Sequence, residues 1–277
     1  MTLGRRSDPV AWLAAPAALY FLGAIGVPLA LLFFGSLKGP EGFGFGNYLK
    51  TLGDAHQRDV ILATLRYAAL VTLGALGFGY AYAYAMATSG PRLRAALLVA
   101  IVLPMTTSII VKTFGWTLIL RSNGPINATL MGAGLIDAPI RLLFTETGLL
   151  LGSVAILMPY MVLPIFAALR QIPLEQLDAA ATLGAGPAYR FWKVTLPLSA
   201  PGIVAGGAIV FSMAISAYVI PSLLTGAGYK TMSKVIANAF LVIHNPALGS
   251  TVGVMLLLLS GAVVLIGGVA AARMTRS

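Results

Sequence analysis

The sequence contains no cysteine and only two histidines, which leaves few residues for metal or redox chemistry. Without cysteine, disulfides and thiolate-ligated metal sites are excluded. His56 and His244 lie far apart in the chain and share no ligand spacing with other candidate residues. We therefore expect no metal site, no histidine-based catalysis and no cofactor bound by this chain.

Charge is also scarce. Charged residues make up 9% of the 277 positions, against roughly 25% in an ordinary soluble domain. Hydrophobic residues make up 58%, so the composition indicates an integral membrane protein. The formal net charge of +10 would suggest nucleic acid in a soluble protein, but no basic run with interleaved aromatics is present. Basic residues at membrane boundaries, facing lipid headgroups, explain the charge better than nucleic-acid binding does.

Six apolar segments are each long enough to cross a bilayer, since a hydrocarbon core about 30 Å thick needs roughly 20 helical residues. Their continuous apolarity, without alternation, favours helices over barrel strands. The first segment follows Arg5 and Arg6 but is longer than the roughly 7 to 15 apolar residues of a secretory signal, so we interpret it as a retained span. The predicted spans are residues 10–34, 60–87, 95–120, 147–169, 199–224 and 247–272.

The predicted fold is all-α, with an N-terminal span ahead of a five-helix core. Residues 1–57 contain the first span and an extracytoplasmic loop rich in glycine and aromatic residues, which we expect to be irregular or interfacial. Residues 58–273 contain the five-helix core. No internal repeat is strong enough to indicate an inverted-repeat secondary transporter.

An even number of spans places both termini on one side of the membrane. The terminal side carries Arg5, Arg6, Arg92, Arg94, Arg170, Arg190, Lys193, Arg273 and Arg276. The opposite side carries Lys38, Lys50, Arg58, Arg121, Arg141, Lys230 and Lys234. Because cytoplasmic loops carry an excess of lysine and arginine, we predict cytoplasmic termini and a cytoplasmic connection 170–198.

That connection interrupts the apolar chain with a segment typical of a soluble surface. Pro173 suits the first turn of a helix, and Glu175 and Asp178 place negative charge near its N-terminal end. Gly184 suits the position after the helix, where the backbone turns left-handed. The pattern therefore predicts a short helix that ends near Gly184.

A second short helix follows, beginning at Pro187 and ending at Pro197. The exposed face of this helix pair mixes small apolar residues with acid. Such a face suits docking into a groove of a partner protein, and it equally suits an amphipathic helix resting on lipid headgroups. The residues alone leave both interpretations open.

The spacing within "DAAATLGAGPAYRFWKVTLP" resembles the EAA loop of ATP-binding-cassette (ABC) importer permeases: Glu-Ala-Ala, three residues, Gly, nine residues, Ile-x-Leu-Pro. This chain departs from it at Asp178, in place of Glu, and at Val194, in place of Ile. The resemblance implies that residues 178–184 form a coupling helix, which fits a cleft in a separate ATPase subunit. The predicted ATPase-coupling residues are Glu175, Asp178, Ala179, Ala180, Gly184, Val194, Leu196 and Pro197.

From about residue 58 onward, stretches such as "LPMTTSIIVKTFGWTLILRSNGPINATL" and "VTLPLSAPGIVAG" resemble the first permease subunit of spermidine/putrescine importers. The resemblance implies a bacterial inner-membrane subunit that pairs with a second, similar permease, two ATPase subunits and an extracytoplasmic substrate-binding protein. ATP and magnesium would then be bound by the ATPase partner. The chain itself has no Gly-x-x-x-x-Gly-Lys-Ser/Thr phosphate loop and is not predicted to be an enzyme.

The solute is harder to predict. A polyamine ammonium group buried without an opposite charge is costly, yet no acid lies within a predicted span. The segment "VIHNPALGS" resembles a family segment that often reads Asp-Trp-Pro, but it lacks the acid. Aromatic faces also attract cations. Our candidate pathway residues are Tyr80, Tyr84, Thr107, Ser108, Trp116, Ser212, Tyr218 and Asn245. The aromatic residues among them would equally serve to pack helices together.

The sequence leaves alternatives to an ABC permease for a polyamine-like solute. The same permease could carry an amino-acid-like compound, a phosphonate or ferric iron. An ion-coupled secondary transporter is less favoured, because proton relays need ionisable groups inside the helix bundle. An intramembrane enzyme is disfavoured because no catalytic pair lies near the membrane midplane.

Overall fold

The computed structural model describes residues 9–39, 42–226 and 228–274, and side chains from residue 16 to residue 269 apart from that of Leu174. The described chain is almost entirely helical and divides into two compact units. Residues 1–58 and 235–255 form the first unit, and residues 59–234 and 256–277 form the second. We describe each unit separately.

The first unit begins with a long helix followed by a hairpin. Its elements are α1 (Pro9–Leu37), β1 (Lys38–Gly39), β2 (Gly42–Phe43) and α2 (Gly46–Gly53). The strands pair antiparallel, with Lys38 opposite Phe43. The Asn47 side chain donates to the carbonyls of Ser36, at 2.9 Å, and Lys38, at 3.1 Å, and so closes the end of α1. The loop that we expected to be irregular therefore contains a hairpin and a helix.

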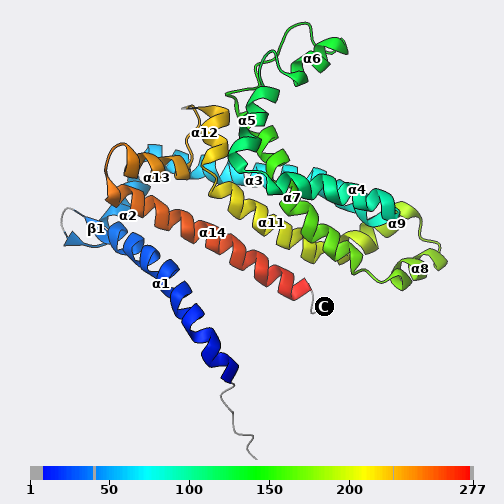
Figure 1. Ribbon diagram of the computed structural model, residues 1–277, viewed down its shortest axis with the longest axis horizontal. Coiled ribbons are helices and arrows are strands. Elements are labelled where there is room, and N and C mark those ends of the chain that lie inside the picture. The colour runs from blue at the N-terminus through cyan, green and yellow to red at the C-terminus, as the bar shows by residue number, and fades with distance from the viewer. Residues whose placement is uncertain (1–8, 40–41, 227, 275–277) are drawn as a thin grey trace, which may run out of the picture. The chain divides into compact units, whose positions relative to one another are not determined.

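The remaining helices follow one another along the chain (Figure 1). They are α3 (Ala55–Thr88), α4 (Pro91–Val102), the 3₁₀ turn η1 (Leu103–Thr106), α5 (Ile109–Ile119), α6 (Pro125–Gly132), α7 (Glu146–Arg170), α8 (Leu174–Thr182), α9 (Pro187–Arg190), the π-helical turn η2 (Phe191–Thr195), α10 (Leu196–Leu198), α11 (Ala200–Ile215), α12 (Val219–Thr225), α13 (Met232–Leu241) and α14 (Pro246–Met274). Most of the connections are short, apart from the longer loop between α6 and α7. Three helices, α3, α13 and α14, each contain a boundary between the two units.

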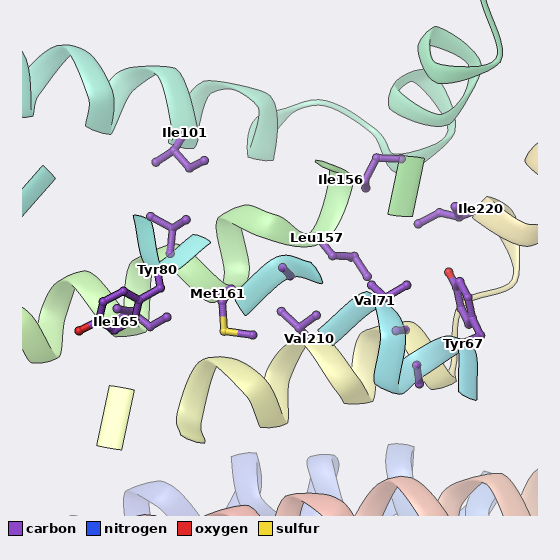
Figure 2. Close-up of a cluster of buried hydrophobic side chains, with 14 of the residues drawn as sticks. Tyr67, Val71, Tyr80, Ile101, Ile156, Leu157, Met161, Ile165, Val210 and Ile220 are labelled. Carbon is purple, nitrogen blue, oxygen red and sulfur yellow. The ribbon is translucent and has the colours of Figure 1, made fainter. Parts of the chain in front are cut away.

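The core of the second unit lies between α3, α7 and α11 (Figure 2). Its labelled side chains include Tyr67, Val71 and Tyr80 from α3, Leu157, Met161 and Ile165 from α7, and Val210 from α11. A buried hydrogen bond of 2.8 Å joins the hydroxyls of Tyr67 and Ser153 and links α3 to α7. Polar links of this kind supplement van der Waals packing where lipid removes the hydrophobic drive between helices.

Two glycines allow α11 to approach α7 closely. A Cβ added at Gly202 would lie 2.6 Å from the carbonyl oxygen of Pro164, and one added at Gly206 would lie 2.9 Å from the sulfur of Met161. Gly202 and Gly206 are four residues apart and lie on one face of the helix. This Gly-x-x-x-Gly spacing is the small-residue contact that membrane helices use to bring their backbones together.

We expect Gly202→Ala to lower the free energy of unfolding by about 1–3 kcal/mol, because the added methyl group overpacks a backbone contact. Gly207→Ala is the matched control, since its Cβ would meet only the Thr72 methyl group, at 3.9 Å. Thermal unfolding of the two variants in the same detergent measures the difference. Equal melting temperatures would show that the close approach of α11 to α7 is unimportant.

Four described helices are long and apolar enough to cross a membrane, and two bent helix pairs raise the number to six when each pair counts as one span. The predicted spans 60–87, 147–169 and 247–272 fall within α3, α7 and α14. The described part of α1 that qualifies as a span begins at Pro16. The multi-span, all-α fold predicted from the sequence is therefore confirmed.

The predicted span 95–120 is present as a bent pair of helices. The chain bends by 106° between Pro91–Thr106 and Ile109–Ile119. Pro104 has no N–H to donate within the helix, and Thr107 adopts an extended backbone with ψ of 143°. Ser108 then caps the new helix by accepting a hydrogen bond from the N–H of Ile110, at 3.3 Å.

The predicted span 199–224 is also broken, because α11 ends at Ile215 and α12 begins at Val219. Pro221 has no N–H, and in a continuous helix its ring would clash with the carbonyl of Ala217, four residues earlier. The chain therefore leaves the helix at Ser216 and starts again three residues later.

Candidate functional site: the 170–198 segment

The first predicted short helix is present as α8, which follows directly after Pro173. Its end is a Schellman motif: the Gly184 N–H donates to the Ala181 carbonyl, and the Ala185 N–H donates to the Ala180 carbonyl, both at 3.0 Å. Gly184 has a φ of +81°, which a side chain would strain. The structure thus forms the helix stop that the sequence predicts.

One face of α8 is exposed. Glu175, Asp178 and Ala179 are all exposed, whereas Leu177 and Ala180 are half-buried. Leu183, just past the helix, is 88% exposed. α8 thus presents an acidic, exposed face with an apolar residue just past its end. A single exposed apolar side chain needs no partner to explain it.

The chain after α8 departs from the prediction at one point. Pro187 begins α9 as expected, but the helical chain runs through the π turn and past Pro197 to Leu198. The break comes at Ser199, where the axis bends by 60°. Pro201 causes it, because it has no N–H to donate to the carbonyl of Pro197. The second short helix therefore ends at Leu198, one residue after the predicted Pro197, and the break at Ser199 separates it from the next span. Val194 and Leu196 are half-buried, and Pro197 itself is exposed.

Aromatic contacts attach this segment to α3. The ring of Phe191 lies edge-to-face with those of Tyr80, Tyr84 and Trp192, at centroid distances of 5.7, 5.4 and 5.3 Å. The hydroxyls of Tyr80 and Ser199 are 3.0 Å apart. The π turn that carries Phe191 is a rare geometry, often found at functional sites.

A hollow of about 650 Å³ lies behind α8. Its lining comes from the end of α3, from α4, from the end of α7 and from α8 to η2. Figure 1 shows α8 and α9 beyond the C-terminal end of α7. The connections 88–94 and 170–198 therefore lie at the same end of the second unit.

The candidate pathway residues do not lie together. Tyr80 and Tyr84 contact Phe191, so these two side chains face the 170–198 segment. Thr107 and Ser108 are exposed at the break between α4 and α5. Trp116 lies against α7 at Gly152, where an added Cβ would be 3.7 Å from it.

The other three candidates lie near helix ends. Ser212 is in the last turns of α11, and its buried hydroxyl has no hydrogen-bond partner among the described residues. Tyr218, at the break before α12, is 46% exposed. In the first unit, Asn245 caps α14 by accepting from the Leu248 N–H at 3.1 Å, and it lines a hollow with residues of α2. Hydropathy gave no signal for these separate positions.

The geometry missed by sequence reasoning concerns Arg94, Arg190, Phe191 and Ser199. Arg94 and Arg190 entered the prediction only as basic residues that set orientation. The pairing of Ser199 with Tyr80 joins residues 119 positions apart, which no local pattern records. The aromatic cluster "YRFW" was visible in the sequence as a possible signal of packing onto another helix.

The described chain is a bundle of helices long and apolar enough to span a membrane, interrupted by an exposed and capped helix pair, which defines a multi-span membrane protein. The chain belongs to the family described as binding-protein-dependent transport system inner membrane component, whose sequence profile matches residues 75–276.

Known relatives agree with this assignment. The chain is 34% identical over 200 residues to the spermidine/putrescine transport system permease protein PotB of Haemophilus influenzae, covering 72% of this chain and 70% of that one. It is 31% identical over 224 residues to the same protein of Escherichia coli K12, covering 81% of each. The fold is similar to a chain in the crystal structure of a bacterial alginate ABC transporter with its pentasaccharide-bound periplasmic protein, with a TM-score of 0.80, 18% identity and coverage of 97% and 95%.

The protein is therefore the permease subunit of an ABC importer and a multi-pass inner-membrane protein. Like its relatives, it is a transport subunit and not an enzyme. Members of this family work together with other subunits.

Proposed function

We propose that α8 and its glycine stop are the coupling element that fits a cleft of the ATPase subunit. The observation that carries this proposal is the exposed, capped helix with Asp178 and Ala179 facing outward and Leu183 beyond its end. Small residues allow a cleft to close tightly around the helix, and an exposed acid supplies charge at its edge. The role of Val194, Leu196 and Pro197 is indirect: they hold the second short helix in place.

The proposed orientation places both termini and residues 170–198 in the cytoplasm. Arg92, Arg94, Arg170, Arg190 and Lys193 all lie in the connections at this end of the second unit or next to them. This excess of basic residues is the support for the orientation. In the proposed domain organisation, residues 58–273 form the permease domain and residues 1–57 form an additional span with an extracytoplasmic loop.

We assign four kinds of partner: a second permease in a heterodimer, two ATPase subunits that bind ATP and magnesium, a substrate-binding protein outside the membrane, and membrane lipid. The solute is polyamine-like, and the names of the relatives support this choice. The solute would pass the two helix breaks, where Thr107, Ser108 and Tyr218 are exposed. Hydroxyl and aromatic groups there would replace part of the solute's hydration.

Proteoliposomes containing the complete complex, with its ATPase, second permease and binding protein, test the proposal. We expect ATP-dependent accumulation of radiolabelled spermidine or putrescine, and no accumulation with a non-hydrolysable ATP analogue. Uptake of a phosphonate or an amino acid instead would overturn the solute assignment and leave the permease role intact. Polyamine uptake by this chain without the ATPase would contradict the coupling role.

A further inference from the structure

Three arginines line the hollow behind α8: Arg94, Arg170 and Arg190. They come from three elements, namely α4, the last turn of α7 and α9. No acidic residue is among the lining residues. The ion pair between Arg66 and Glu146 lies elsewhere, since neither of these residues lines the hollow.

The three arginines differ in how they are held. Arg94 is fixed by the end of α3, because its guanidinium donates to the carbonyls of Met86, Ala87 and Ser89 at 3.1, 3.4 and 2.7 Å. Arg190 is half-buried, and its Nε is buried without a hydrogen-bond partner among the described residues. Arg170 is exposed.

The hollow brings three guanidinium groups together without an acidic side chain among its lining residues to pair with them. Arginine forks match the oxygens of phosphate and carboxylate groups. The walls beside the arginines are apolar, with Leu169 and Ile172 from the end of α7 and the connection after it. A phosphate attached to a hydrocarbon chain satisfies both parts of the lining, whereas a free inorganic ion satisfies only the charged part.

We propose that the hollow lined by Arg94, Arg170 and Arg190 binds the phosphate of an anionic phospholipid. Basic pockets at the ends of membrane helices bind such headgroups by charge and hydrogen bonding together. Arg190 and Arg170 donate to the phosphate. The bound lipid fills the space between α8 and the ends of α3 and α7. If the 170–198 segment is cytoplasmic, as proposed above, the lipid belongs to the cytoplasmic leaflet. The binding of the phosphate does not depend on that orientation.

The test uses the complete complex in nanodiscs of equimolar phosphatidylglycerol and phosphatidylcholine, extracted into detergent, with the retained lipids counted by mass spectrometry. We expect the wild-type complex to retain phosphatidylglycerol preferentially. The double variant Arg170→Gln, Arg190→Gln should lower that preference by about tenfold or more, since each arginine near a lipid surface contributes on the order of a fivefold effect. Arg190→Lys keeps the positive charge and should retain more of the preference for phosphatidylglycerol than the double variant does.

Arg92→Gln is the matched control, because Arg92 is exposed, lies on the same helix as Arg94 and does not line the hollow. Its lipid preference should be unchanged. Equal loss in Arg92→Gln and in the double variant, or no preference in the wild type, would overturn the proposal. Displacement of the lipid by millimolar inorganic phosphate would overturn the lipid as the source and identify a free-anion site.

ATPase co-purification separates this proposal from the coupling role. If the double variant loses the ATPase and keeps its phosphatidylglycerol preference, the arginines bind the partner protein and the lipid proposal is wrong. If Ala179→Arg loses the ATPase while lipid retention persists, the two sites are independent and the lipid proposal stands. Loss of lipid preference in the double variant with normal ATPase assembly supports the lipid site directly.

Discussion

Replacing Gly184 by valine is expected to uncouple the permease from its ATPase. Gly184 has a φ of +81°, and a Cβ built there would meet nothing within 4 Å. Steric room is therefore not the problem. The left-handed backbone costs an L-residue roughly 1–2 kcal/mol, and more for a β-branched one. The Schellman hydrogen bonds to Ala180 and Ala181 would be weakened, and α8 would end differently.

Gly186→Val is the matched control for this change. Gly186 lies two residues later, has equally open surroundings and an extended backbone with φ of −66°. A strain of 1–2 kcal/mol shifts an equilibrium about 5- to 30-fold, so we expect Gly184→Val to lower binding-protein-stimulated ATP hydrolysis by roughly that factor. Gly186→Val should stay near wild type. Equal rates of stimulated ATP hydrolysis in the two variants would show that the helix stop at Gly184 plays no part in coupling.

Ala179→Arg changes the same element without changing its backbone. The exposed Ala179 sits on the outward face of α8, where a long charged side chain would obstruct a close-fitting cleft. The expected result is a folded permease that no longer co-purifies with the ATPase. A normally assembled and active complex would contradict the docking of this face.

Replacing Phe191 by alanine is the second change with a large expected effect. Its ring has three edge-to-face neighbours, Tyr80, Tyr84 and Trp192. Aromatic pairs contribute about 0.5–1.5 kcal/mol each beyond their buried area, so we expect a loss of unfolding free energy of about 2–4 kcal/mol. The loss would also loosen the attachment of the 170–198 segment to α3, and ATP hydrolysis should respond less to the binding protein.

Thermal unfolding of the permease and stimulated ATP hydrolysis of the complex measure the two consequences. Tyr189→Ala provides the stability control, since Tyr189 lies two residues away and is 59% exposed. We expect its melting temperature to match the wild type. If Phe191→Ala melts at the wild-type temperature as well, the aromatic cluster does not hold the segment in place.

The sequence carried enough information for the spans and for α8. Long apolar runs are a strong signal because the bilayer imposes a minimum helix length. Gly184 and Pro187 have local conformational preferences that determine a helix end and a helix start. Hydropathy measures apolarity and says nothing about the direction of the chain, so it did not show the breaks near Thr107 and Ser216. Pro104 and Pro221 are typical of kinks, but their positions alone do not give a bend of 106°.

The residues near α8 show why sites are harder to predict than helices. Tyr80 and Tyr84 were assigned to the solute pathway because aromatic faces attract cations. In the structure these two rings meet Phe191, more than a hundred positions later. Tertiary contacts of this separation leave no trace in a local pattern. Arg94 was in the same situation, because only the fold reveals that it caps α3.

The cap formed by Arg94 also bears on the order in which the protein assembles. Its hydrogen bonds reach residues only five to eight positions earlier, and contacts this local form early in folding. The α3–α4 corner is therefore expected to be set soon after it leaves the ribosome. The opposite wall, with Arg190 and Phe191, is synthesised about a hundred residues later, at roughly 5–20 residues per second. For several seconds during synthesis, Arg94 at the α3–α4 corner is therefore in place before Arg190 and Phe191 have been made.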